Sequence, residues 1–453
     1  MKRIIICLSV LAAFLQGCGV YQKYSKTTEV DKNLFGDEYA GADTFSIATV
    51  SWREFFNDPM LRRLIDSALV RNTDLRTAHL RTEQASAALS ATRLAYLPSV
   101  SLTGDGAVSR WDGQDAKTYN LGTGASWELD IFGRVRNAKM EAKSALEASQ
   151  AYEQAVRTSL IATVASSYYS LLMLDEQLAI NERTLDNWTR TVSAMNSLMK
   201  AGYFNKTAIL QAEANKMALE QAVLSVKQSI CETEKSLCSL LARTPGSIER
   251  GVLSDQSFPQ ELSIGLPVSL LANRPDVRQA EAQLAQAFYA VGSARSAFYP
   301  SLTLSGSAGW TNNVGGVVVN PGDLLMNMAG SLVQPLFNKG ANAANLKIAK
   351  AEQEAALLAF QQKLLDAGAE VNNSLSSWQT ARKRLEIGEK RIATLRETVQ
   401  KTERLMKHSS VNYLEVLTAQ QSLLAAEESQ AQDRFEEIRS IIALYQALGG
   451  GWR

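Results

Sequence analysis

The feature that most constrains the fold of this chain is an internal duplication. Residues 73–104 read TDLRTAHLRTEQASAALSATRLAYLPSVSLTG, and residues 275–306 read PDVRQAEAQLAQAFYAVGSARSAFYPSLTLSG, with 12 of 32 positions identical. Further along, four residues recur at an offset of 207, namely Leu210/Leu417, Ala212/Ala419, Ala218/Ala425 and Glu220/Glu427. The 453 residues are therefore predicted to form one architecture built twice, rather than several unrelated domains.

Each copy of the repeat changes from a helical to a strand pattern at a proline. In the second copy, Val277, Leu284 and Val291 recur at the spacing of a helix face, and Pro300 disfavours the α region for the residue before it. After this proline the period becomes two, so one face is apolar and the other carries small polar residues. The predicted elements are a helix from Asp58 to about Leu97 with strands Val100–Trp111 and Tyr119–Leu129, and in the second copy a helix at 275–298 with strands at 301–313 and near 324–335.

The four strand patterns have the dimensions of membrane-crossing β-strands. Each run holds roughly 12 residues, and at about 3.3 Å per residue a tilted strand of that length crosses a ~30 Å hydrocarbon layer. Tryptophans near the strand ends, such as Trp111 and Trp127, are also typical of outer-membrane barrels. On this interpretation Leu102, Leu121, Leu304 and Leu332 face lipid, whereas Thr103 and Ser305 face the lumen. A soluble hairpin is the alternative.

Long helices are predicted to follow each pair of strands. Residues 136–201 contain neither proline nor glycine, and about 65 residues at 1.5 Å each make a helix of roughly 100 Å. A return helix is predicted at 207–241, and the second copy repeats the pair with a helix at 342–408 and a last helix after Asn412. Helices of this length exceed the needs of a globular core, so they are predicted to be staves of a coiled coil or helical barrel.

The N-terminal residues carry the pattern of an exported lipoprotein. Lys2 and Arg3 precede an apolar stretch, 4–15, that is too short for a permanent membrane helix. The run Leu15-Gln16-Gly17-Cys18 resembles a bacterial lipobox, which predicts a diacylglycerol thioether on Cys18; an ordinary signal peptide with a chance cysteine is the alternative. The predicted organisation is a signal peptide at 1–17, a lipidated lead-in at 18–50, a first repeat at 51–244, a linker at 245–273 and a second repeat at 274–453.

The number of strands predicts an oligomer. Four strands cannot close a barrel, and an open sheet edge in lipid leaves unpaired backbone groups at a cost of several kcal/mol each. Two chains would supply eight strands, whose interior is filled by side chains, whereas three supply twelve and leave a lumen. The predicted fold is therefore mainly α with membrane β, in which three chains form a 12-stranded barrel and a long α-helical barrel around an open tube.

Three motifs resemble those of a known family. They are the Arg-Pro-Asp-Val-Arg-x-Ala-Glu run at 274–281, the Tyr-Pro-Ser-Leu run at 299–302 and the Asn-Tyr-Leu-Glu-Val-Leu-Thr-Ala-Gln run at 412–420. With their order and duplication, they resemble the outer-membrane factor family of TolC-like and OprM-like channels over residues 50–450, and the lipobox resembles its lipoprotein branch. The resemblance implies a homotrimer, lipid-anchored in the cell outer membrane with a large periplasmic portion. It also implies docking on a periplasmic adaptor (membrane fusion protein) and an inner-membrane RND-type pump.

The same resemblance implies a passive exit duct for small molecules, with energy and substrate selection supplied by the pump. Its periplasmic end is expected to close near the helix-hairpin tips, around 202–205 and 409–412. Leu414 falls on a position that often forms a constricting ring in the family, and Glu415 is a neighbouring candidate. Thr418 stands where relatives commonly have Asp, so this chain departs from a carboxylate gate at that position. Packing of Leu414 within the helix seam is the alternative interpretation.

Other function classes find little support in the sequence. A net charge of +1 argues against a nucleic-acid surface, and four cysteines and two histidines are too few for a metal-rich site. We expect no cofactor and no catalytic residue, because His79 and His408 each stand alone on a charged helix face. A periplasmic adaptor has a long helical hairpin but lacks two pairs of membrane-length strands. A type I protein-secretion channel shares the architecture and remains the alternative function, although the lipobox favours efflux.

Overall fold

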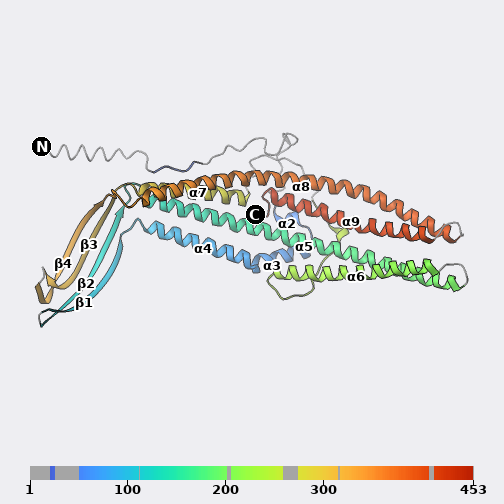
Figure 1. Ribbon diagram of the computed structural model, residues 1–453, viewed down its shortest axis with the longest axis horizontal. Helices are drawn as coiled ribbons and strands as arrows, with labels where there is room; N and C mark the ends of the chain where they lie inside the picture. The colour runs from blue at the N-terminus through green and yellow to red at the C-terminus, as the bar shows by residue number, and fades with distance from the viewer. Residues whose placement is uncertain are drawn as a thin grey trace. The chain divides into compact units, whose positions relative to one another are not determined.

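The computed structural model describes residues 21–25, 50–111, 113–200, 206–258, 274–314, 317–407 and 413–451 (Figure 1). The chain divides into two compact units of three segments each. The first unit contains Met1–Glu29, His79–Ala151 and Arg278–Lys363, and the second contains Val30–Ala78, Tyr152–Val277 and Leu364–Arg453. Among the described residues, no helix is both long enough and apolar enough to cross a membrane.

The first unit holds a four-stranded antiparallel sheet in the order β1-β2-β3-β4 (Figure 1). The strands are β1 Ser99–Trp111, β2 Gln114–Leu129, β3 Ser301–Val314 and β4 Val317–Val333. β4 begins earlier than its prediction near residue 324, because the apolar run at 317–319 lacks the alternation that marks a half-buried strand. Pro321 is tolerated within β4, since it falls at the irregularity of the β3–β4 register, between the partners of Thr311 and Asn313, where no ladder hydrogen bond is required of it.

A side chain continues the sheet where the backbone ladder between β2 and β3 ends. The ladder stops at Asn120 and Thr311, and the register of the β3–β4 pair shifts between Thr311 and Asn313. The buried Asn312 amide donates to the carbonyl of Lys117 at 2.8 Å and accepts from the amide of Tyr119 at 2.7 Å. The Asn312 side chain thus supplies the two hydrogen bonds that a bulged backbone cannot make.

The helices of the two repeats match residue for residue, which confirms the duplication. α4 Thr73–Leu94 and α7 Pro275–Ser296 have 22 residues each at an offset of 202. α5 Arg134–Lys200 and α8 Ala341–Lys407 have 67 each, and α6 Lys206–Leu240 and α9 Tyr413–Ala447 have 35 each, all at an offset of 207. The offset changes by five residues between the first strand and the first long helix, so the second copy has the longer β-hairpin.

The prediction of one continuous helix from Asp58 to about Leu97 is wrong. The structure has a short α2 at Trp52–Phe55, α3 at Pro59–Arg71 and then α4, with a break at Asn72. Asn72 has an extended ψ of 130°, and its Oδ1 accepts the amides of Asp74 and Leu75 at 3.0 Å each. Its amide nitrogen also donates to the carbonyl of Leu240 at 3.0 Å. These local hydrogen bonds cap a new helix and compete with continuation of the old one.

The core of the second unit is built around the N-terminus of α3. Asp58 caps α3, as predicted, by accepting the amide of Met60 at 2.8 Å. Its other carboxylate oxygen accepts the hydroxyl of Tyr168 at 2.6 Å and the amide of Gln256 at 3.1 Å. Burial raises the pKa of Tyr168 well above its ordinary value, so this hydroxyl stays a donor. The contacts join α3, α5 and the segment that follows α6.

Candidate functional site

The sheet of the first unit has two chemically different faces, and the strand register identifies the residues on each. Directly opposite residues of antiparallel strands point to the same side. The register pairs Leu102 with Thr123, Thr123 with Ala308, and Ala308 with Met326. The large side chains on this apolar face are Val100, Leu102, Val108, Tyr119, Leu121, Trp127, Leu304, Trp310, Leu324, Met326, Met328 and Leu332. The four predicted lipid-facing leucines thus share one face.

The apolar face is open to its surroundings within a single chain. The twelve side chains named for this face have exposed fractions from 38% at Trp127 to 96% at Met328. A continuous apolar surface of this kind marks an interaction with a membrane or another chain, because water-exposed surfaces of monomers rarely carry one. No charged side chain interrupts the central part of this face, between Val100 and Val108 on β1 and between Leu302 and Trp310 on β3.

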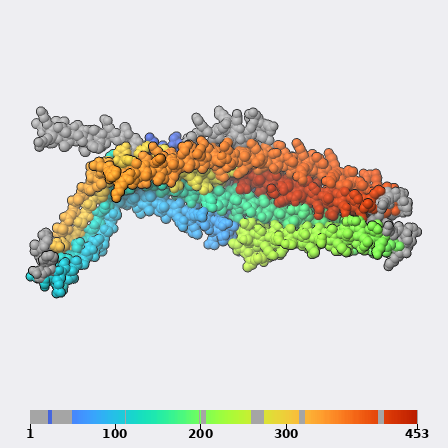
Figure 2. Space-filling model, in the orientation of Figure 1, coloured from blue at the N-terminus to red at the C-terminus, as the bar shows by residue number. Residues whose placement is uncertain are grey.

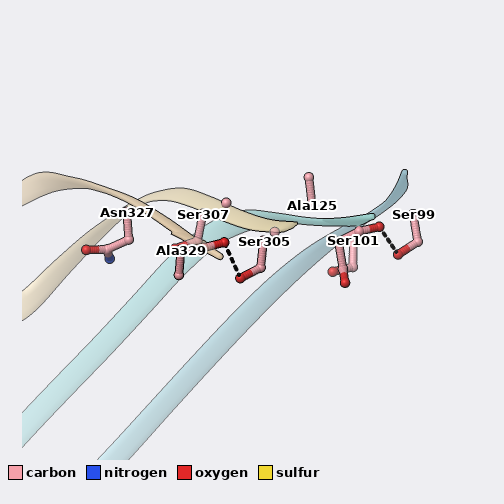
Figure 3. Close-up of a pocket in the computed structure, with 10 residues that line it drawn as sticks. Ser99, Ser101, Ala125, Ser305, Ser307, Asn327 and Ala329 are labelled. Carbon is pink, nitrogen blue, oxygen red and sulfur yellow. Dashed lines mark hydrogen bonds between the residues drawn. The ribbon is translucent and has the colours of Figure 1, made fainter. Parts of the chain in front are cut away.

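The opposite face is polar and forms a shallow trough of about 350 Å³. Here the register pairs Ser101 with Gly124, Gly124 with Ser307, and Ser307 with Asn327. Figure 3 shows the side chains of Ser99, Ser101, Ser305 and Asn327 on one side of the sheet and that of Ala125 on the other. The predicted lumen residues Thr103 and Ser305 both lie on this polar face.

The hydroxyls of the polar face are only partly used by the protein. Ser99 donates to the carbonyl of Ser126 at 3.2 Å, and Thr103 donates to that of Gly122 at 3.3 Å. Each hydroxyl keeps its two acceptor lone pairs, so the face can be hydrated without offering a charged binding group in the trough. Such a wall can bound an aqueous path.

The three predicted gate residues lie together at the start of α9, on the side directed away from the core of the second unit. Leu414 is 58% exposed, and Glu415 and Thr418 are also exposed. The Thr418 hydroxyl donates to the Leu414 carbonyl at 2.8 Å, one turn earlier. In this orientation the three side chains are available to meet a second chain, and α9 is visible in red at the surface in Figure 2.

The neighbouring residues of α9 form the helix seam. Val416 and Leu417 are buried and pack with Met195 of α5 and with Ile209 and Ala212 of α6. The seam at this level therefore contains Val416 and Leu417, and the side chain of Leu414 points away from it. The predicted constriction sites at 202–205 and 409–412 lie outside the described residues, as does the predicted lipidation site, Cys18.

Of the two histidines considered for an enzyme, the structure describes one. His79 lies 3.6 Å from Glu83, one helical turn away on the exposed side of α4, and His408 lies outside the described residues. Across the described ranges, no group of three or more His, Cys, Asp or Glu side chains could hold a metal ion.

Sequence reasoning missed an ionic cluster that joins α5, α8 and α9. The Glu427 side chain is only 10% exposed and accepts from Arg183 at 2.8 Å and from Arg396 at 2.7 Å. The only hint in the sequence was that Glu427 has a counterpart, Glu220, in the first repeat. That counterpart gives no guide to the cluster, because Glu220 pairs with Lys216 one turn away and is half exposed. The cluster depends on which helices meet, and helical periodicity does not contain that information.

Comparison with known proteins identifies the family. The sequence model described as "Outer membrane efflux protein" matches residues 64–243 and 266–450, which is most of the chain. The chain belongs to the outer membrane efflux protein family. Its membership agrees with the duplicated fold and the two-faced sheet, and it excludes the periplasmic adaptor considered above.

Individual family members support the same conclusion. The cation efflux system protein CusC of Escherichia coli O6:H1 is 30% identical over 452 residues, covering 98% of each chain. A protein named probable outer membrane lipoprotein SilC, from Salmonella typhimurium, is 30% identical over 413 residues, covering 90% of this chain and 89% of its own. The solved open state of the MtrE outer membrane channel of Neisseria gonorrhoeae is 30% identical, with a TM-score of 0.85 over 96% of this chain and 98% of that one. This efflux protein is therefore an outer-membrane channel with the TolC-like fold, and the names of its relatives favour efflux over protein secretion.

Proposed function

We propose that three copies of this efflux protein assemble into the outer-membrane exit duct of a tripartite efflux system. A periplasmic adaptor and an inner-membrane RND-type pump would deliver the cargo, and the duct would conduct it passively, without catalysis of its own. The observation that carries the proposal is the two-faced sheet, since an apolar outside and a hydroxyl-rich inside suit a barrel between lipid and water. Twelve strands from three four-stranded sheets leave a lumen, whereas eight do not.

The trough chemistry suits a duct that does not select its cargo. Small hydroxyls, glycines, alanines and the amide of Asn327 line it, so neither charge nor aromatic stacking would retain a passing molecule in the trough. Selection would then belong to the pump. The name of CusC contains cation efflux, but a cation substrate would not require a binding site in this wall.

We place the resting closure at the start of α9, with Leu414 as the principal residue and Glu415 and Thr418 as its neighbours. Three exposed leucines that meet on the axis would form an apolar constriction, which resists ions by dewetting. Burial of three leucine side chains contributes only a few kcal/mol, so adaptor contacts could reverse it.

Thiol labelling under a planar-bilayer voltage clamp tests the proposed conduit. Cysteine at Ser305, on the polar face, should react with a charged methanethiosulfonate reagent and lower the single-channel current. Cysteine at Leu304 is the matched control, because it is the adjacent residue on the apolar face and should leave the current unchanged. Equal effects at both positions, or none at Ser305, would refute a lumen bounded by the polar face.

We also propose that Cys18 is acylated, on the basis of the lipobox at 15–18. One acyl chain binds a membrane marginally, and the three of this lipoprotein class hold firmly. Mass spectrometry of the mature protein should show an N-terminal acylated cysteine, and Cys18→Ser should lose the lipid while the strands keep their own affinity for the bilayer. A mature protein that begins elsewhere, or carries an unmodified cysteine, would exclude the anchor.

A further inference from the structure

Contacts near the ends of the strands show which residues of the two repeats correspond. Trp127 of β2 donates to the carbonyl of Tyr96 at 2.9 Å, and Gln334, which follows β4, donates to the carbonyl of Phe298 at 3.0 Å. The donors Trp127 and Gln334 are 207 residues apart, and the acceptors Tyr96 and Phe298 are 202 residues apart. The same two offsets relate the helices of the repeats. Left-handed glycines, Gly133 with φ 77° and Gly340 with φ 80°, precede α5 and α8 at the same offset of 207.

Within one chain, the strands of the two repeats pair with each other at a single place. β2 of the first repeat pairs with β3 of the second, with Gly122 opposite Gly309. The outer edges of β1 and β4 have no partner strand among the described residues, because the sheet order is β1-β2-β3-β4. An unpaired edge in lipid is strongly disfavoured, so in the assembly β4 must meet β1 of a neighbouring copy.

We propose that β4 of one copy pairs with β1 of the next copy in the register that β2 and β3 use within the chain. Adding 207 to Gly122 gives Ala329, and subtracting 202 from Gly309 gives Ala107. Ala329 therefore lies opposite Ala107 of the neighbouring copy, and Val333 lies opposite Thr103 of that copy. The interface rests on the proposed trimer and specifies which residues of a second copy of this chain complete the barrel wall.

The proposed register keeps the two faces continuous across the seam. On the apolar side it places Met328, which is 96% exposed, opposite Val108, which is 71% exposed in the chain alone. Leu332 lies opposite Gly104, repeating the large-to-small pairing that Leu121 makes with Gly104 on the other side of β1. On the polar side, Ser331 lies opposite Asp105.

A rival register differs by two residues. The similar pairs Ile131-Phe132 and Leu336-Phe337 suggest an offset of 205, which would place Ala329 opposite Asp105 of the neighbour. A shift of two preserves both faces, so the hydrophobic pattern cannot decide between the registers. The strand registers do: Ser99 lies opposite Ser126 in the first repeat, and its counterpart Ser301 lies opposite Val333 in the second, so β4 follows β2 at an offset of 207 and not 205.

Disulfide trapping between copies tests the register in the full-length protein in outer-membrane vesicles. Ala329→Cys is combined with Ala107→Cys, Asp105→Cys or Ser109→Cys, in a background where the exposed Cys231 is serine. Directly opposite positions have Cβ atoms about 4.5–5.5 Å apart and diagonal ones about 7–8 Å apart, whereas a disulfide needs about 3.5–4.5 Å. The pair Ser305→Cys and Ala329→Cys, which are opposite within the chain, calibrates the oxidation rate.

We expect the Ala107 pair to form intersubunit disulfides at least about ten times faster than either diagonal pair. Faster trapping with Asp105 or Ser109, equal rates for all three, or no trapping in a protein that is trimeric by native mass spectrometry would overturn the register. A wild-type protein that is not trimeric would instead overturn the proposed function.

Discussion

At the scale of single residues, Arg250 pairs with two carboxylates of the second unit. Its Nε and Nη2 donate to the two carboxylate oxygens of Asp175 at 2.5 and 2.9 Å, its Nη1 donates to Glu234 at 2.5 Å, and its side chain is 17% exposed. The hydrogen bond from Arg250 to Asp175 raises the pKa of the guanidinium further above its ordinary value, so it stays charged at any physiological pH. Arg250→Met would leave two partly buried carboxylates without their cation.

We expect Arg250→Met to lower the free energy of unfolding by roughly 3–5 kcal/mol, measured by chemical denaturation with circular dichroism. Arg53→Met is the matched control, because Arg53 pairs with Asp66 at the surface, with 56% and 44% of the two side chains exposed. An exposed pair contributes at most about 1 kcal/mol. Similar losses for both variants would show that burial does not set the strength of the Arg250 contacts.

Leu414 supports a prediction on conductance. If three Leu414 side chains close the duct, Leu414→Ser should raise the single-channel conductance of the intact trimer in planar bilayers. Leu358→Ser is a suitable control, since Leu358 is 57% exposed but belongs to the first unit, whereas Leu414 belongs to the second. Unchanged conductance in a folded Leu414→Ser trimer would move the closure elsewhere, with Glu415 and Thr418 tested next.

At the scale of elements, neighbouring residues of β3 should differ sharply in their tolerance of charge. Leu304→Arg places a guanidinium on the apolar face and should cost about 2–4 kcal/mol near the bilayer centre, measured by reversible folding into lipid vesicles. Ser305→Arg should fold with nearly wild-type stability and change the conductance, because this side chain lies on the polar face. Equal destabilisation by both substitutions is incompatible with a barrel whose outside is the apolar face.

The helices and strands that local sequence patterns specify were predicted, and those that depend on distant contacts were not. Period-two alternation located β1, β2 and β3, and the absence of proline and glycine located α5, because both signals are local. The break at Asn72 was missed, since it depends on that side chain bonding to the carbonyl of Leu240 as well as to its own backbone. At the site, the shared faces of the strands were predictable, whereas the Arg183–Glu427–Arg396 cluster was not, because it joins α5 of the first repeat to α8 and α9 of the second.

At the scale of the whole molecule, duplication explains why one chain supplies a third of a closed wall. We propose that residues 51–244 and 274–453 act as the two repeats, joined by the linker at 245–273, and that each contributes a strand pair and a helix pair. Six such repeats would then surround the axis of the trimer. The strand order within the chain and the unpaired edges of β1 and β4 fit this arrangement.

Electron cryomicroscopy of the protein in lipid nanodiscs would show directly whether three copies close a barrel with the polar face inside. We expect a threefold-symmetric particle with a twelve-stranded barrel, in which Ser101 and Ser305 line an open lumen and Leu102 and Leu304 contact lipid. A dimer with a filled eight-stranded barrel, or a trimer with the leucine face turned toward the lumen, would contradict it.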